Sequence, residues 1–79
     1  MTWIEFHTAS EIAAIEAEEA YRSGDATNAR LLYEKAAESE QKALVAVDSA
    51  KTRTKGITAV SAVALWYKAA AYKRAEQLA

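Results

Sequence analysis

Few side chains in this sequence could take part in chemistry, and they are scattered along the chain. His7 is the only histidine and cysteine is absent, so a metal at His7 would lack the second histidine or thiolate that such sites use. Glu16, Glu18 and Glu19 stand close together, but acid–base catalysis needs carboxyl groups in a concave site, and a helix surface leaves them in water. We therefore predict that His7 is a surface residue ahead of the first helix and that the protein is not an enzyme and holds no metal or cofactor.

The sequence gives equally little support for phosphate binding. Glycine occurs only at positions 24 and 56, so the sequence contains no glycine-rich loop of the kind that cradles a phosphate. Lys51, Arg53 and Lys55 alternate with threonines near an expected helix start, where backbone N–H groups favour anions. This segment is either an anion site or a solvated turn, and the sequence leaves both interpretations open.

Composition indicates one all-α domain spanning residues 1–79. Alanine is abundant and proline is absent, a composition typical of closely packed helices. A chain of 79 residues has a small core, so association with another molecule often supplements its stability. The absence of cysteine and of a leader-like start at residues 1–7 predicts a cytoplasmic protein.

Charge is distributed unevenly although the net charge is only −1. Residues 1–24 contain five acidic residues and one basic residue, whereas residues 51–79 contain six basic residues and one acidic residue. The small net charge argues against general nucleic-acid binding, which needs a clear cationic surplus. The asymmetry instead favours a specific orientation between protein partners.

Helix boundaries follow from caps and apolar spacing. Thr8 and Glu11 fit a capping box, and Ile12 and Ile15 then begin an apolar stripe, so the first helix is predicted at 9–23. Gly24 is suited to the residue just past a helix end, and Asp25 can cap the following helix. The second helix is predicted at 26–50, and together the two helices form a hairpin.

The third helix is predicted at 55–78, after a weakly marked turn. Neither proline nor a well-placed glycine separates it from the second helix, so a fused, domain-swapped rod is the alternative to a hairpin. Residues 56–67 carry no charge, but this run is well short of the roughly 20 residues that a bilayer requires. Because this helix is apolar on nearly every side, we expect part of it to bind a partner. The expected partner-binding residues are Val60, Val63, Trp66, Tyr67, Ala70 and Tyr72.

The hairpin resembles a tetratricopeptide repeat unit at its turn and along its second helix. The matching residues are Tyr21, Gly24, Asp25, Ala29, Tyr33 and Ala36, with a weaker echo at Trp66, Tyr67, Tyr72 and Ala75. Ala13 and Ala17 stand where the family has tryptophan and glycine, no proline closes the unit, and the second helix is long for the family. The resemblance implies an antiparallel three-helix unit that binds proteins.

A second resemblance competes with the first. The order of three helices, with Gly24 and Asp25 at the first turn and residues 74–78 near the end, is similar to microtubule-interacting-and-trafficking domains. That resemblance implies a receptor for a short amphipathic helical peptide.

The sequence therefore predicts a protein–protein interaction module. Self-association through the apolar third helix is the first expectation, and a helix-in-groove peptide receptor is the alternative. Binding to a membrane surface through Trp3, Phe6 and the basic turn is the least favoured interpretation, and the expected partners include neither nucleic acid nor membrane.

Overall fold

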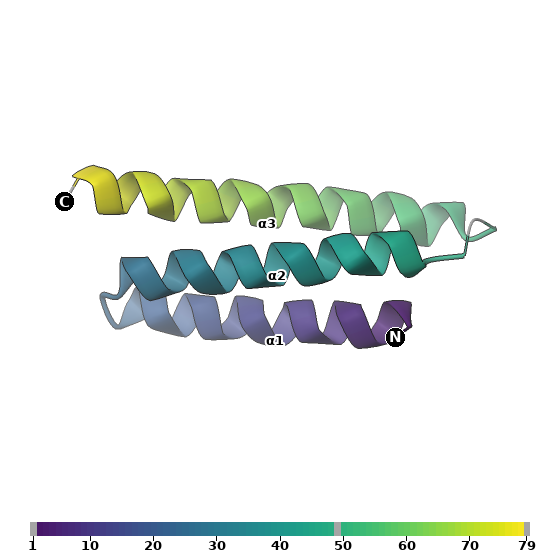
Figure 1. The fold of residues 1–79 in the computed structure, drawn as a ribbon, viewed down its shortest axis with the longest axis horizontal. Helices are drawn as coiled ribbons and strands as arrows, with labels where there is room; N and C mark the ends of the chain where they lie inside the picture. Colours follow the sequence, from purple (N-terminus) through teal and green to yellow (C-terminus); the bar gives the residue numbers. More distant parts are fainter. Residues whose placement is uncertain (1, 49, 79) are drawn as a thin grey trace.

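Three helices make up the protein in a computed structural model that describes residues 2–48 and 50–78 (Figure 1). They are α1 (Trp3–Arg22), α2 (Ala26–Ala46) and α3 (Thr52–Leu78), and the described residues contain no strand. The chain reverses direction at each connection, and α2 lies between α1 and α3. The molecule is elongated, with extents of 45 × 18 × 15 Å. The predicted all-α class is confirmed.

Helix α1 starts earlier than the sequence pattern indicated. Thr2 is the N-cap, its hydroxyl accepts a hydrogen bond from the Glu5 N–H, and the Glu5 carboxylate accepts one from the Thr2 N–H. The predicted start at residue 9, with Thr8 and Glu11 as the capping box, is therefore wrong. The added turns are held by Trp3, which bonds to Thr58 on α3, and by His7, which contacts Glu40 on α2.

The turn between α1 and α2 has the chemistry that its sequence predicts. Gly24 has a φ of 84°, and its N–H donates to the Tyr21 carbonyl at 3.0 Å while the Asp25 N–H donates to the Ala20 carbonyl at 2.9 Å. This pair of bonds is a Schellman motif, which satisfies carbonyls that the helix end leaves free. The Asp25 carboxylate then accepts from the Asn28 N–H at 3.0 Å and caps α2.

The second connection is a turn, so the fused-rod alternative is wrong. Helix α2 ends at Ala46 rather than near residue 50, and α3 begins at Thr52 rather than near residue 55. Val47 is extended, the Asp48 carboxylate accepts from the Ala50 N–H at 3.0 Å, and the Asp48 carbonyl accepts from the Lys51 N–H at 2.9 Å. Residue 49, which the expected second helix included, lies outside the described residues. Because the Asp48 side chain is short, its carboxylate reaches a backbone N–H only two residues away. This contact holds a tight turn in a segment that has neither glycine nor proline.

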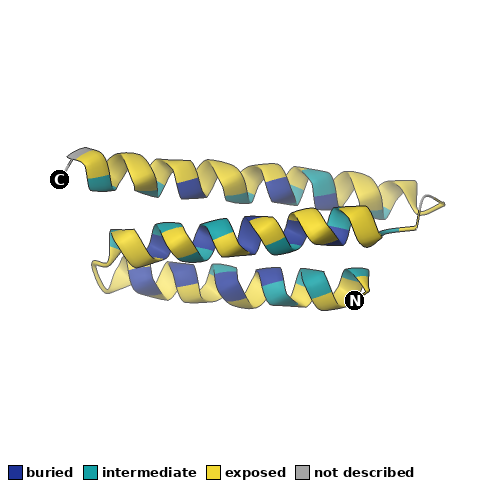
Figure 2. Ribbon diagram, in the orientation of Figure 1, coloured by how far each residue is buried: buried dark blue, intermediate teal, exposed yellow. Residues whose placement is uncertain are grey.

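Alanines form the interface between α1 and α2. Buried residues concentrate on α2 and on the side of α1 that faces it (Figure 2). Because an alanine side chain is a single methyl group, the two backbones can approach closely along this line. The buried alanines of the pair are Ala13, Ala17, Ala20, Ala29, Ala36, Ala37 and Ala43. Ile12 and Ile15, with which the predicted apolar stripe begins, are exposed.

Helix α3 packs on α2 with one narrow side. Thr58, Ala62 and Ala69 are its buried residues, and their four- and seven-residue spacing places them on one face. At the far end, the Arg30 guanidinium on α2 binds the Glu76 carboxylate at 3.0 Å. No helix in the described part of the chain combines the length and hydropathy needed to cross a bilayer.

Candidate functional site

The outer face of α3 is the first candidate surface, and we define it as Val60, Val63, Trp66, Tyr67 and Ala70. Val60 is 71% exposed and Tyr67 is 75% exposed, and Val63 and Ala70 are also exposed. At 3.6 residues per turn, Val60, Val63, Tyr67 and Ala70 lie within about 80° of one another. They project away from the side that carries Thr58, Ala62 and Ala69, so α2 leaves them uncovered.

A shallow apolar hollow of about 290 Å³ lies on this face, lined by Val63, Trp66, Tyr67 and Ala70. Trp66 is 39% exposed, and its indole N–H donates to Gln41 Oε1 on α2 at 3.2 Å. This bond holds the ring at the border between α2 and the outer face. The surface therefore offers an aromatic side chain with one polar contact already made, an arrangement common at protein interfaces.

Tyr72 does not belong to this surface, although the sequence placed it there. Its ring stacks on the buried Tyr33 with centroids 5.3 Å apart and an angle of 3° between the planes, and the Tyr21 ring lies 5.1 Å away. Tyr72 is five residues after Tyr67, which puts it nearly halfway around the helix. The three rings join α1, α2 and α3, and burial raises the pKa of Tyr33 to about 12.

The six residues that carry the repeat resemblance lie around the first turn and along α2. Ala29, Tyr33 and Ala36 are buried on α2, and Gly24 and Asp25 form the turn. The remaining residue, Tyr21, is largely exposed. Five of these positions therefore form the turn or the helix contacts.

Sequence reasoning missed a second apolar surface, the outer face of α1, which we define as Ile4, Ile12 and Ile15. Ile4 is 61% exposed and Ile15 is 60% exposed, and all three isoleucines lie within about 80° of one another on the helix. Exposed glutamates flank them, namely Glu11, Glu16 and Glu19. The isoleucines form a stripe that is offset around the helix from the buried alanines. The sequence prediction treats the two stripes as one, and for that reason it does not identify this surface.

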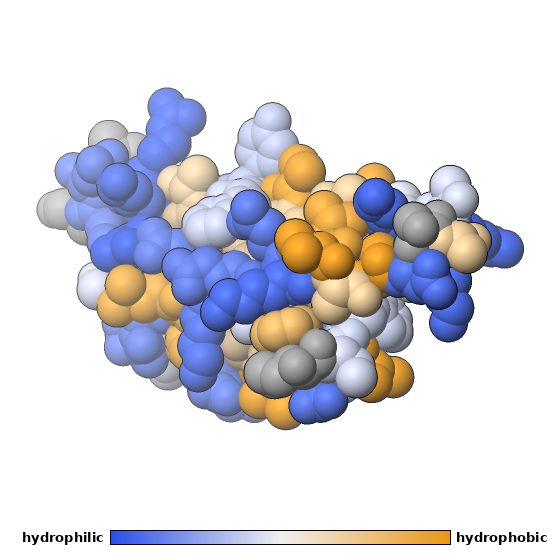
Figure 3. Space-filling view, turned by 45° about the vertical axis from the view of Figure 1, so that its right-hand side comes forward, coloured by the Kyte–Doolittle hydropathy of each residue, from blue (hydrophilic) through white to orange (hydrophobic). Residues whose placement is uncertain are grey.

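Hydrophobic side chains also gather in the space-filling view (Figure 3). A group of strongly hydrophobic side chains reaches the surface in the upper part of this face and lies between hydrophilic areas on either side.

A further hollow, of about 520 Å³, lies between α1 and α2. Its apolar lining consists of Phe6, Val45 and Ala46, and Glu38, Gln41 and Lys42 surround it.

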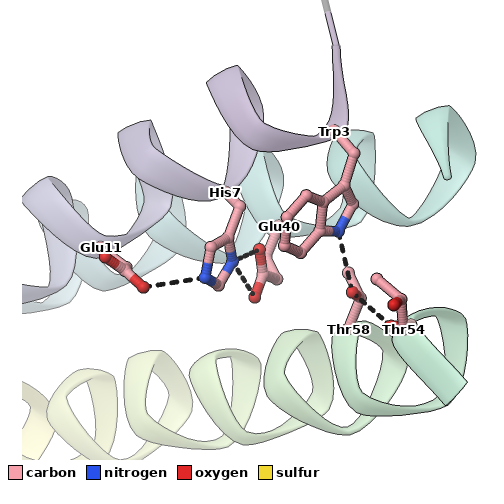
Figure 4. A network of polar contacts seen from close by, with 6 residues as sticks. All are labelled: Trp3, His7, Glu11, Glu40, Thr54 and Thr58. Atoms are coloured by element: carbon pink, nitrogen blue, oxygen red, sulfur yellow. Dashed lines mark hydrogen bonds and ion pairs between the residues drawn. The ribbon is translucent and has the colours of Figure 1, made fainter.

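His7 belongs to a polar cluster that crosses all three helices (Figure 4). Its Nδ1 lies 2.9 Å and 3.1 Å from the two carboxylate oxygens of Glu40, which is 1% exposed, and its Nε2 lies 2.8 Å from Glu11 Oε1. The Trp3 ring stacks on His7, and the Trp3 indole N–H donates to Thr58 Oγ1 at 3.0 Å. The prediction that His7 is a surface residue ahead of the first helix is wrong.

The electrostatics of the cluster favour a charged His7. Burial lowers the pKa of His7, but the hydrogen bond and charge of Glu40 and those of Glu11 outweigh this effect, so the pKa stands above its ordinary 6.5. Carboxylate oxygens only accept hydrogen bonds, so the ring satisfies both partners only as an imidazolium with two N–H donors. Within the described residues no group of histidine, aspartate and glutamate has the arrangement needed to hold a metal. The cluster joins α1 to α2 through a partly buried ion pair and α1 to α3 through the Trp3–Thr58 hydrogen bond.

The basic segment at the second connection is exposed, with Lys51, Arg53 and Lys55 all in contact with water. Their side chains make no ion pair that would order them toward a common point within the described residues. Free cations suit both a solvated turn and an anion site, so each interpretation stays a prediction.

Comparison with known proteins leaves the family open. No family model matches the chain, and neither a curated protein nor a solved structure shows significant similarity to it.

Proposed function

We propose that this protein is a non-enzymatic, tetratricopeptide-like interaction module that associates with a second copy of itself through the outer face of α3. The observation that carries this proposal is the exposure of Val60, Val63 and Tyr67 on the side of α3 opposite α2. A scattered exposed apolar residue needs no explanation, but a contiguous row with an aromatic border is typical of interaction surfaces.

The size of the chain supports the same conclusion. The core consists largely of alanines, which bury little apolar area each, and its largest buried side chain is Tyr33. Covering the outer face of α3 would remove several large apolar side chains from water. Association would therefore add stabilisation that the small core does not supply.

Substitution of Val63 by glutamate tests this function. Val63→Glu places a charge in the middle of the outer face, where a docked partner would have to desolvate it. We expect the parent to self-associate at micromolar concentration in sedimentation equilibrium or light scattering, and Val63→Glu to weaken that association at least tenfold. The helix content by circular dichroism should remain unchanged because residue 63 is exposed.

Val45→Glu is the matched control, since Val45 is 84% exposed on α2 and lies outside the outer faces of α1 and α3. This variant should associate as the parent does. A parent that stays monomeric throughout the micromolar range would contradict the proposal. If that monomer gained thermal stability on addition of an amphipathic helical peptide, and Val45→Glu removed the gain, the peptide-receptor alternative would be favoured through the hollow at Phe6, Val45 and Ala46.

A further inference from the structure

We propose that the surface that receives the outer face of α3 is the outer face of α1 on the next copy, so that the copies associate head to tail. This inference rests on the proposed self-association and specifies which two surfaces meet. It makes Ile4, Ile12 and Ile15 a binding site that pairs with Val60, Val63 and Tyr67.

The apolar parts of the two faces match in length. Along a helix with a rise of 1.5 Å per residue, the row from Ile4 to Ile15 covers about 16 Å and the row from Val60 to Ala70 covers about 15 Å. Each row is about 80° wide around its helix, the width of a single helix–helix contact stripe. Both rows lie on the sides of their helices that point away from α2, at opposite edges of the molecule (Figure 1).

The charges around the two faces are opposite in sign. Glu16 and Glu19 are exposed beside the isoleucines of α1, and so is Glu11, whose carboxylate also contacts His7 at 2.8 Å. On α3 the exposed charged residues are basic, namely Arg53, Lys55, Lys73 and Arg74, together with Lys68, whose ammonium lies over the Tyr33 ring of α2. The acidic residue Glu76 does not offset them, because its carboxylate already binds Arg30 of α2 at 3.0 Å.

This charge pattern selects against the symmetric alternatives. Two α3 faces would bring basic residues together, and two α1 faces would bring acidic residues together, and like charges across an interface are unfavourable. Pairing α3 with α1 instead brings opposite charges together around matched apolar rows. Such a contact joins two different surfaces, so it leaves a free surface at each end and allows further copies to add.

A mixing experiment with two blocked variants tests the arrangement. Ile15→Glu blocks the outer face of α1, and Val63→Glu blocks the outer face of α3, while each variant keeps its other face intact. We expect each variant alone to be monomeric at a concentration where the parent forms species larger than a dimer. An equimolar mixture should form a complex of one copy of each, because the free α3 face of one variant docks on the free α1 face of the other.

The outcomes separate this inference from the proposed function. If Ile15→Glu alone still dimerises while Val63→Glu does not, two α3 faces pair, so the head-to-tail inference is wrong and the proposed self-association stands. If both variants are monomeric and their mixture is too, the two faces do not bind each other and the inference also fails. A monomeric parent would refute the proposed function itself.

A second pair of variants guards against an effect on folding. Ile12→Glu and Tyr67→Glu change other exposed residues of the same two faces and should give the same complementation. The Val45→Glu variant, with its charge on α2, should form the same large species as the parent. Circular dichroism and thermal unfolding of each variant alone should show the helix content of the parent.

Discussion

At His7, both ring nitrogens face carboxylates that come from two different helices, Glu11 on α1 and Glu40 on α2. A buried carboxylate without a cationic partner is costly, so Glu40 depends on the imidazolium form of His7. The Trp3 ring lies parallel to the imidazole at a centroid distance of 4.8 Å and limits its movement. Protonation of this one residue therefore affects how the first turns of α1 are held.

The stability of the protein should depend on pH through His7. The pKa of His7 is raised in the folded protein, so its contribution to the free energy of unfolding is fully present below about 6.5, the unfolded value, and is lost as pH rises through the folded pKa. We expect urea unfolding to show a lower stability at pH 8 than at pH 6. His7→Gln should remove this dependence and lower stability at pH 6 by about 1.5–3 kcal/mol, the typical value for a hydrogen bond to a charged group.

Glu11→Gln is the matched control for that measurement. Glu11 is largely exposed, so replacing it removes a solvent-screened contact and should cost less than about 1 kcal/mol, as is usual for surface ion pairs. Equal pH profiles for the parent and His7→Gln would mean that the cluster does not couple protonation to folding.

The sequence did not reveal this cluster because its members are far apart along the chain. Trp3 and Thr58 are 55 residues apart and His7 and Glu40 are 33 residues apart, so their contacts depend on how the helices align. The local pattern at Thr8 and Glu11 suggested a cap and hid the helix turns before it. A lone histidine next to an aromatic residue was, in this case, the only local signal.

At the scale of the helices, local chemistry made the first connection predictable. Gly24 and Asp25 form a Schellman turn and an N-cap through contacts within a few residues, and such contacts can be inferred from residue types. The second connection depends on Asp48 and on an extended Val47, for which residue types give a much weaker signal. The positions of the two turns fix the helix lengths and thereby the register of α1 and α3 on α2.

The two glycines should respond to alanine in opposite ways. Gly24 has a positive φ, where a Cβ is strained, so Gly24→Ala should destabilise the protein by about 1–2 kcal/mol. Gly56 lies inside α3, and a methyl group at this position would extend into open space, so Gly56→Ala should stabilise the protein by up to about 1 kcal/mol. Thermal and urea unfolding of the two variants check this pair. Effects of the same sign would contradict the assigned turn.

The apolar stripes show how far helical periodicity can be used. The alanine positions of α1 and α2 form the core, and their spacing identified the second helix correctly at Ala29, Tyr33 and Ala36. On α1 the sequence prediction places Ile12 and Ile15 in one apolar stripe with the alanines, but both isoleucines are exposed. Close packing explains this difference, since α2 approaches α1 along the small residues.

At the scale of the whole molecule, the two outer faces have opposite charge and similar apolar length. The sequence predicts that the third helix has more apolar surface than the other two helices cover. Its exposed apolar residues are Val60, Val63, Trp66 and Tyr67. The proposed partner surface on α1 does not follow from the sequence, because the sequence analysis places Ile12 and Ile15 in the same apolar stripe as the alanines.

Salt should distinguish the proposed pairing from a symmetric one. Raising the ionic strength from about 0.1 M to 1 M shortens the Debye length from about 10 Å to 3 Å and screens exposed charges. Association of an acidic face with a basic face should therefore weaken as sodium chloride is added, measured by sedimentation equilibrium at fixed protein concentration. Two basic α3 faces would instead associate more tightly with added salt, and that result would contradict the head-to-tail arrangement.

The central position of α2 has a practical consequence for engineering. Because α2 separates the two edges of the molecule, exposed side chains on either edge can be redesigned. The buried alanines at which the helices pack then stay unchanged. A tandem gene fusion of several copies could thus carry a different recognition sequence on each unit, or end in a unit whose edge has been made fully polar to terminate growth.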